Sequence, residues 1–217
     1  VINPDAPYAY YFQRGSGRAT RILGRRDSAD FLNWSGLRTV IDLDLDDPPG
    51  TELYSASGDR ANRTDGGLHL IMLHVFSTDP AEPYAQPMAG SYWGEDAPSA
   101  TPIRTDGFID SQLAVSRDTV SWQRYRQPFL PRGAAGAWDW GMLYADAPIR
   151  HQDKLWIFYQ GNNLTHFGRS PQIWDTPFAT EQHRNKGVAV LRPDGYVSVE
   201  AAAYAPGLLI THRFRQE

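Results

Sequence analysis

Short runs of apolar or alternating residues recur along the whole chain, and each run is about the length of a β-strand. Gly, Pro, Asp or Asn bounds each run, and these residues end strands and form turns. Few segments show the 3.6-residue periodicity of an amphipathic helix, and no strand–helix–strand alternation stands out. The sequence therefore predicts an all-β, antiparallel protein. The runs are residues 8–15, 38–44, 68–76, 111–118, 154–161, 187–195 and 196–202.

A short motif recurs between these runs. Asp30 and Trp34 are four residues apart in DSADFLNWS, and Asp118 and Trp122 have the same spacing in SRDTVSWQ. A third turn, at Asp194, follows in LRPDGY. We interpret the pattern as a repeat of four strands, in which the third strand ends in this turn. Repetition predicts that both aspartates shape turns and that both tryptophans pack between repeats.

Repeated four-stranded antiparallel units are typical of β-propellers. The expected blades are 1–47, 51–133 and 137–214, within one domain that spans residues 1–217. A closed propeller has about four to eight blades. We therefore expect a partial propeller, with the missing blades supplied by a longer chain or by self-association with another copy.

Composition excludes several kinds of partner. The formal net charge of −4 at pH 7 and the pI of about 5.9 argue against nucleic acids and anionic membranes, which attract basic surfaces. No segment approaches the roughly 18 apolar residues of a membrane span. The lack of cysteine excludes disulfides, thiolate metal sites and cysteine nucleophiles. The 7 Trp, 11 Tyr and 9 Phe suit a protein that exposes aromatic rings for stacking.

Motifs for other chemistries are absent from the sequence. The histidines show no HExxH spacing, the glycine-rich stretch RGSGRATR lacks a P-loop lysine, and there is no G-x-S-x-G elbow. The acidic run from Asp42 to Asp47 is interpreted as a solvated loop, with a weak structural calcium site as the alternative. We expect no cofactor and no catalytic metal.

A family resemblance is carried by residues 110–161, from DSQLAVSRD to KLWIFYQG, and by GVAVLRPDGYVSVEAAAYAPGLLIT at 187–211. These segments resemble bacterial proteins of the five-bladed propeller superfamily of glycoside hydrolase families 32, 43 and 68, and are most similar to a family-32-like branch. The resemblance extends to DFLNWS and DDPPGTELYSA. It implies a five-bladed propeller of which this chain holds about three blades, and cleavage of a glycosidic bond, with a furanose favoured.

The resemblance also bears on where the protein acts. No signal peptide is recognisable, and Val1 is expected to follow a processing or fragment boundary. We expect a bacterial protein that works outside the cytoplasm.

Glycoside hydrolysis usually needs two carboxyl groups, one as acid and one as base or nucleophile. The resemblance places acidic residues on the innermost strands around a central funnel. The candidates there are Glu52, Asp110 and Asp139. Glu52 is the expected general acid, because burial beside Tyr54 and under a loop would favour its protonated form. The alternative is a solvated carboxylate at a strand edge.

Asp139 is expected to act as a base or to stabilise the positive charge of an oxocarbenium-like transition state. A turn-capping aspartate is the alternative. Asp110 is expected to hydrogen-bond the substrate or a catalytic neighbour, and a structural role is the alternative. Trp138 and Trp140 would share one face of a strand, with Asp139 on the other. One of the two rings can then stack on a sugar while the other packs.

Two long polar segments, 77–109 and 162–186, are expected to cover the face on which Glu52 and Asp139 begin their blades. Their aromatic and histidine side chains are candidates for substrate contact or for anchoring the loops. Arg104 would bind an acidic sugar or pair with Asp106. The candidates in these segments are Tyr84, Tyr92, Trp93, His166, Trp174 and His183.

The sequence thus favours a carbohydrate-active protein whose partner is an oligo- or polysaccharide and whose reaction is glycosidic hydrolysis by carboxylates. Two alternatives stay open. One is a noncatalytic carbohydrate-binding or structural propeller module, and the other is an inactive fragment of a larger enzyme.

Overall fold

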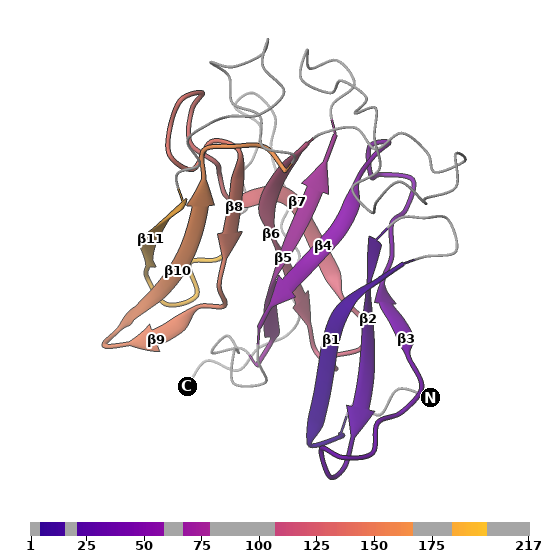
Figure 1. Cartoon of the computed structure of the whole chain (residues 1–217). Helices are drawn as coiled ribbons and strands as arrows, with labels where there is room; N and C mark the ends of the chain where they lie inside the picture. The colour runs from indigo at the N-terminus through magenta and orange to yellow at the C-terminus, as the bar shows by residue number, and fades with distance from the viewer. Residues whose placement is uncertain (1–4, 16–20, 59–66, 79–106, 167–183, 199–217) are drawn as a thin grey trace, which may run out of the picture.

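A computed structural model describes residues 5–15, 21–58, 67–78, 107–166 and 184–198 (Figure 1). These residues form eleven β-strands and no helix, which confirms the all-β prediction. Within the same residues, no helix is long and apolar enough to cross a membrane. The strands are β1 (Tyr8–Gly15), β2 (Arg21–Ser28), β3 (Arg38–Ile41), β4 (Glu52–Ser57), β5 (His69–Ser77), β6 (Phe108–Ser116), β7 (Gln123–Leu130), β8 (Met142–Ala145), β9 (Ile149–His151), β10 (Lys154–Asn162) and β11 (Arg184–Leu191).

The strands form two sheets. The smaller has the order β1-β2-β3, and the larger has the order β11-β10-β8-β6-β5-β4, with β7 paired to β6 and β9 paired to β10. The sheets curl, so that the described strands form a half-barrel (Figure 1). A propeller of four-stranded blades stays a prediction, because only β4–β7 make a four-stranded antiparallel meander among the described residues.

An antiparallel unit nevertheless recurs three times. The first unit is β1–β3, the second is β4–β7, and the third is β8, β10 and β11. Glu52-Leu53-Tyr54 of β4 and Met142-Leu143-Tyr144 of β8 hold the same place, because Glu52 pairs with Phe76 of β5 and Met142 pairs with Asn162 of β10. Both leucines are completely buried. The register therefore makes β4 equivalent to β8, β5 to β10 and β6 to β11.

The repeated turn follows β2 and β6. In the first turn, Asp30 Oδ1 accepts hydrogen bonds from the amides of Leu32 (2.9 Å) and Asn33 (2.7 Å). In the second, Asp118 Oδ1 accepts from Val120 (2.9 Å) and Ser121 (2.7 Å). The structural role predicted for both aspartates is confirmed.

The residues after these aspartates complete the match. Phe31 and Thr119 have φ values of 65° and 62°, and their carbonyls accept hydrogen bonds from the indole N–H groups of Trp34 (3.1 Å) and Trp122 (3.2 Å). Asp194 follows β11 with a φ of 53° and so marks the same point in the third unit. The hydrogen bonds that the Asp118 carboxylate accepts from the backbone amides of Ser121 and Val120 lower the pKa of Asp118 to about 2.

The core lies between successive units. One cluster packs Leu23 and Ile41 of the first unit against buried side chains of β4–β6 in the second. A second cluster packs the second unit against Leu143, Ala145 and Ile157 of the third. Each unit therefore buries one face against the unit before it and the other against the unit after it, where such a unit is present.

Candidate functional site

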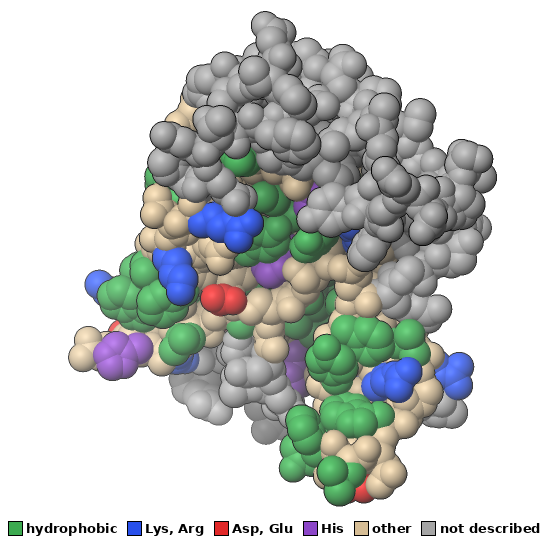
Figure 2. Space-filling model, viewed as in Figure 1, with side chains coloured by type: hydrophobic (Ala, Val, Ile, Leu, Met, Phe, Trp, Pro, Cys, Tyr) green, Lys and Arg blue, Asp and Glu red, His purple; other side chains and the backbone are tan. Residues whose placement is uncertain are grey.

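A single row of side chains crosses the larger sheet. Directly paired residues in a sheet project to the same face, so all six members of this row share one face. In register order they are Glu52, Phe76, Ile109, Met142, Asn162 and Arg184. Figure 2 shows basic, histidine and hydrophobic side chains close together over the middle of this sheet.

This face is concave. Tyr54 on β4 and Tyr144 on β8 are separated by two strands, which in a flat sheet would put them about 14 Å apart. Their ring centroids are 6.2 Å apart. His166 joins them, with its ring 5.3 Å from that of Tyr54. The curl of the sheet therefore brings side chains from distant strands into one site.

Arg21 supplies the charge partner of Glu52 at this site. Its Nη1 lies 2.7 Å from Glu52 Oε2, and both side chains are at most 15% exposed. The guanidinium also lies over the Tyr54 ring, 5.0 Å from its centroid. The Gln13 amide, in the orientation that satisfies both partners, accepts from Arg21 Nε (3.0 Å) and donates to the Tyr54 carbonyl (2.8 Å). We call Arg21, Glu52, Tyr54, Tyr144 and His166 the Glu52 site.

The Glu52 carboxylate keeps hydrogen-bonding capacity. Its Oε2 is buried and forms the 2.7 Å ion pair with Arg21 Nη1, with no further donor among the described residues. A buried carboxylate oxygen normally has a donor. The ion pair is made by the carboxylate form, which accepts protons and hydrogen bonds but cannot donate them.

Two further groups line the same face. Burial raises the pKa of Tyr144, partly offset by the positive charges of Arg184 and Arg21, so its hydroxyl stays protonated. His74 is buried, and its Nδ1 lies 2.6 Å from Ser55 Oγ while its Nε2 lies 3.0 Å from the Ala145 carbonyl. Because a carbonyl only accepts, Nε2 carries the proton and Ser55 donates to Nδ1.

The pairing of β5 with β6 places Asp110 on the face of the sheet opposite to Glu52. Asp110 pairs with Val75, one position away from the Phe76–Ile109 pair that shares a face with Glu52. Successive residues of a strand project to opposite faces. Asp110 binds Arg132 at 2.8 Å. The structure therefore does not bring Glu52 and Asp110 onto one face, and a catalytic role for Asp110 stays a prediction.

The prediction of a strand at residues 138–140 is wrong. These residues form a turn, and β8 begins only at Met142. Trp138 stacks on Tyr159 with ring centroids 5.6 Å apart, and Trp140 packs edge-on against Phe108 at 5.2 Å. Turn residues pack according to local geometry and not by alternation, so the two rings have different neighbours.

Asp139 lies in this turn beside Tyr159. Burial, together with the negative charge of Asp139, raises the pKa of the Tyr159 hydroxyl. Tyr159 pairs with Ala145, so it lies on the face of the third unit that packs against Leu70 and Met72 of β5. The role of Asp139 in catalysis stays a prediction.

Some of the other predicted site residues lie within the residues that the structure describes, and some lie outside them. Tyr54 and His166 lie in the Glu52 site. Sequence reasoning missed Arg21, His74 and Tyr144, although the likeness of ELYSA and MLYAD could have indicated Tyr144. Trp93, Arg104, Trp174 and His183 lie outside the described residues, as do Tyr84 and Tyr92.

Two arginines of β7 form ion pairs with the acidic run that follows β3. Asp44 lies 2.6 Å from Arg126, and Asp47 lies 2.9 Å from Arg124. Among the described residues, no group of three or more His, Cys, Asp or Glu is arranged to hold a metal ion. These ion pairs give the run a structural use, and the calcium alternative stays untested.

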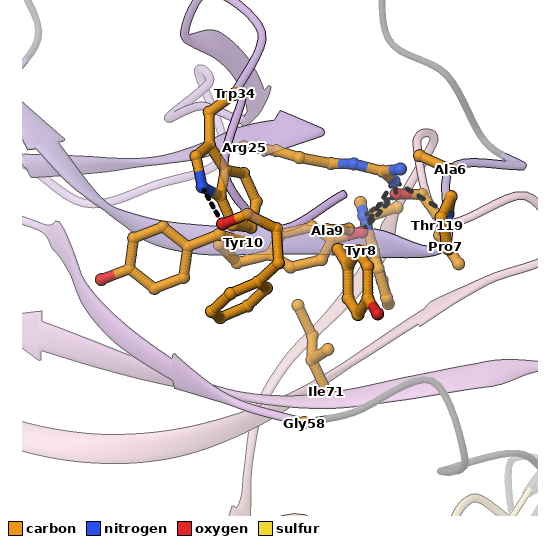
Figure 3. Close-up of a pocket in the computed structure, with 13 residues that line it drawn as sticks. Ala6, Pro7, Tyr8, Ala9, Tyr10, Arg25, Trp34, Gly58, Ile71 and Thr119 are labelled. Atoms are coloured by element: carbon orange, nitrogen blue, oxygen red, sulfur yellow. Dashed lines mark hydrogen bonds between the residues drawn. The ribbon is translucent and has the colours of Figure 1, made fainter. Parts of the chain in front are cut away.

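A separate cavity lies between β1 and the adjoining ends of β4 and β5 (Figure 3). Its volume is about 540 Å³, and its lining includes Tyr8, Tyr10 and Trp34, with Ile71 and Gly58 across from them. The buried Arg25 donates to Thr119 Oγ1 (2.8 Å) and to the Tyr11 hydroxyl (2.9 Å) at one side. The cavity is therefore mainly aromatic with one polar wall.

Comparison with known proteins finds likeness in structure alone. No family model and no curated protein matches the sequence. The fold matches a BT0996 RGII complex at a TM-score of 0.50 and 16% identity, over 90% of this protein and 44% of the matched one. A structure described as a glycoside hydrolase gives the same values.

A third match has the same TM-score of 0.50, at 14% identity over 79% of this protein and 42% of the other. It is an N-acetylgalactosamine deacetylase from F. plautii in complex with blood group B trisaccharide. The chain thus spans less than half the length of each of these solved structures. At such identities the likeness is one of fold.

Proposed function

We propose that the protein binds a saccharide at the Glu52 site. The observation that carries the proposal is the buried Oε2 of Glu52, which has its ion pair with Arg21 but no further donor among the described residues. A sugar hydroxyl is a neutral donor whose hydrogen bond this oxygen can accept beside its ion pair. Bound there, it would replace water without leaving a buried charge unsatisfied.

The other groups of the site suit the same class of ligand. The partly exposed rings of Tyr54 and Tyr144 add aromatic surface beside Glu52, and the Arg21 guanidinium lies over the Tyr54 ring. Arg21 carries several N–H donors for ring and hydroxyl oxygens. A concave site with aromatic walls and a few directed polar groups is typical of small-molecule recognition.

The structural neighbours support this class. Two of them are described as a glycoside hydrolase and as a deacetylase in complex with a trisaccharide. A shared fold does not transfer function by itself. The neighbours support a carbohydrate-related role only together with the chemistry of the Glu52 site.

The second candidate function is hydrolysis of a glycosidic bond, as in the family resemblance. One of its carboxyl groups would be Glu52, the expected general acid, which lies beside Arg21. Of the other two predicted carboxylates, Asp110 lies on the opposite face of its sheet, and Asp139 lies in the turn beside Tyr159. Binding is therefore the function that the geometry supports first.

The test compares the native protein with Glu52→Gln. Titration calorimetry would measure binding of neutral and acidic oligosaccharides, and a panel of aryl furanosides, aryl pyranosides and polysaccharides would report hydrolysis. Removing a hydrogen bond to a charged group costs about 1.5–3 kcal/mol, so affinity should fall roughly tenfold to a hundredfold. Loss of a catalytic carboxylate would lower turnover by about 10²–10⁴-fold.

Asp153→Asn is the matched control, because Asp153 is an exposed carboxylate in the turn before β10. It should bind and turn over like the native protein. Thermal unfolding would confirm that Glu52→Gln is folded. The proposal is wrong if the native protein binds no saccharide of the panel, or if the folded Glu52→Gln variant binds as tightly as the native protein.

A further inference from the structure

The three units pack on one another in the same direction. We call the face of a unit that meets the following unit its forward face, and the opposite face its rear face. The forward face of the second unit carries Leu70, Met72, Leu113 and Val115, from two cross-strand pairs of β5 and β6. The rear face of the third unit covers it with Leu143, Ala145 and Ile157.

The register identifies the matching face of the third unit. Met72 pairs with Leu113 in the second unit, and the equivalent pair in the third is Phe158 with Val188. Leu70 pairs with Val115, and the equivalent pair is Trp156 with Val190. The third unit therefore repeats the apolar character of a forward face.

Burial of the two faces differs sharply. Leu70, Met72 and Leu113 are at most 1% exposed, whereas Phe158 and Val188 are 46% and 47% exposed. Val190 is 45% exposed. Four adjacent apolar side chains on one sheet face form a patch of the kind that marks an interaction site.

The internal interfaces show what covers a forward face. In both core clusters, the covering surface is the rear face of another unit: Ile71 and Leu73 of β5 in the first cluster, and Leu143 and Ile157 in the second. A rear face is apolar and presents large side chains from its inner strands. The forward face of the third unit has the same chemistry and so suits the same kind of partner.

The rear face of the first unit is also exposed along β1, whereas Ile22 of β2 on the same side is buried. In the first unit, Tyr11 of β1 faces the second unit, so Tyr8, Tyr10 and Phe12 lie on the rear face. Tyr8 is 44% exposed and Tyr10 is 57% exposed. Tyr10 stacks on Phe12 at 5.1 Å. Figure 2 shows hydrophobic side chains gathered at both places, over the β9–β11 end and over β1.

We propose that a second copy of this chain docks its first unit on the third unit of the first copy. The rear face at Tyr10 and Phe12 covers the forward face at Phe158 and Val188. The contact is head-to-tail, because the two surfaces are different. Head-to-tail contacts propagate, so association gives a closed ring or an open chain of molecules. This inference is independent of the proposed saccharide binding.

The cavity of Figure 3 adjoins the proposed rear face. Tyr8 and Tyr10 belong to both, and Phe31 and Trp34 extend the lining. Phe31 is 63% exposed, and its ring lies 5.3 Å from that of Tyr8. The open apolar surface at this end therefore extends from β1 into the turn after β2.

The experiment uses one lysine on each face. Sedimentation velocity over a range of concentrations should show reversible association of the native protein. Val188→Lys on the forward face and Tyr10→Lys on the rear face should each weaken association by about tenfold or more, because a charge would have to be buried. Leu45→Lys is the control, since Leu45 is a fully exposed apolar residue outside both faces, and it should associate like the native protein.

Mixing the two variants gives the decisive result. Val188→Lys keeps an intact rear face and Tyr10→Lys keeps an intact forward face, so the mixture should form a 1:1 dimer that neither variant forms alone. Circular dichroism would verify that both variants are folded. A native protein that stays monomeric at all concentrations overturns the proposal. Unchanged association of either folded variant, or a mixture without the dimer, overturns it equally.

Discussion

At the scale of the residue, His74 is a buried polar group whose hydrogen bonds are complete. Burial lowers its pKa from the ordinary value of 6.5, while the Ala145 carbonyl and the charge of Asp146 act in the opposite direction. The neutral ring joins three strands, through Ser55 on β4, its own place on β5, and Ala145 on β8. Protonation would force Nδ1 to donate toward the hydroxyl from which it now accepts.

This pKa shift predicts how stability depends on pH. The unfolded chain takes up a proton at His74 as the pH falls through 6.5, whereas the folded chain takes it up only at a lower pH. Stability from His74 is therefore present above pH 6.5 and is lost as the pH falls from there toward the lowered pKa. Urea unfolding at several pH values should show a smaller loss of stability in this window for His74→Gln than for the native protein.

His151→Gln is the control for this measurement, because His151 is exposed on β9. It should show the same pH dependence as the native protein. Equal pH profiles for His74→Gln and the native protein would show that His74 is not responsible for the dependence.

At the scale of the element, Gly161 of β10 shows how closely the turn before β8 approaches the sheet. A Cβ at this position would lie 2.4 Å from the Trp138 ring and 2.5 Å from Asp139 Cβ. Gly161→Ala should therefore destabilise the protein by about 1–3 kcal/mol, the usual cost of overpacking. Chemical denaturation would measure the change.

Gly36→Ala serves as the comparison for Gly161→Ala. No atom lies within 4 Å of a Cβ at Gly36, so its effect should stay within about 0.5 kcal/mol. If both substitutions have the same small effect, the turn is not packed against β10 as described.

Sequence patterns predicted the apolar strands and failed on the charged ones. The runs at 8–15, 68–76 and 154–161 coincide closely with β1, β5 and β10, because their apolar or aromatic content dominates any local window. β2 and β7 were implied only by the four-strand repeat, since RILGRRDS and QRYRQPFL are rich in arginine and contain no apolar run. Arg25 of β2 is 1% exposed only because Asp27 and Thr119 satisfy it, and a local pattern does not contain that contact.

The Glu52 site, like the strands, could be predicted only in part from the sequence. Glu52 and Tyr54 follow from their place at the start of an inner strand, but Arg21 lies far away in the chain and has no local signal. The faces of Glu52 and Asp110 depend on pairing across three strands. A shift of one residue in register would reverse either face, so spacing alone could not decide whether the two carboxylates meet.

At the scale of the whole molecule, stability should come from the contacts between units. Met72 and Phe158 are equivalent by register but are 0% and 46% exposed. Met72→Ala should cost about 2–5 kcal/mol, as for other buried side chains. Phe158→Ala should cost much less in dilute solution, where a second copy is dissociated. Thermal unfolding of both variants at low protein concentration would measure the difference.

Comparable losses for the two variants would contradict this picture. They would mean that Phe158 is covered within a single molecule. The large difference expected would show that the same position in two units changes from core to surface according to whether another unit follows.

The equivalence of Glu52 and Met142 has a structural consequence. Both residues hold the same place on the first strand of their units, and the same Leu-Tyr pair follows each of them. When a structural unit recurs in one chain, one copy can keep a packing residue at a position where the other carries a charged one. The two units therefore differ at this position, with a buried methionine in one and an ion-paired glutamate in the other.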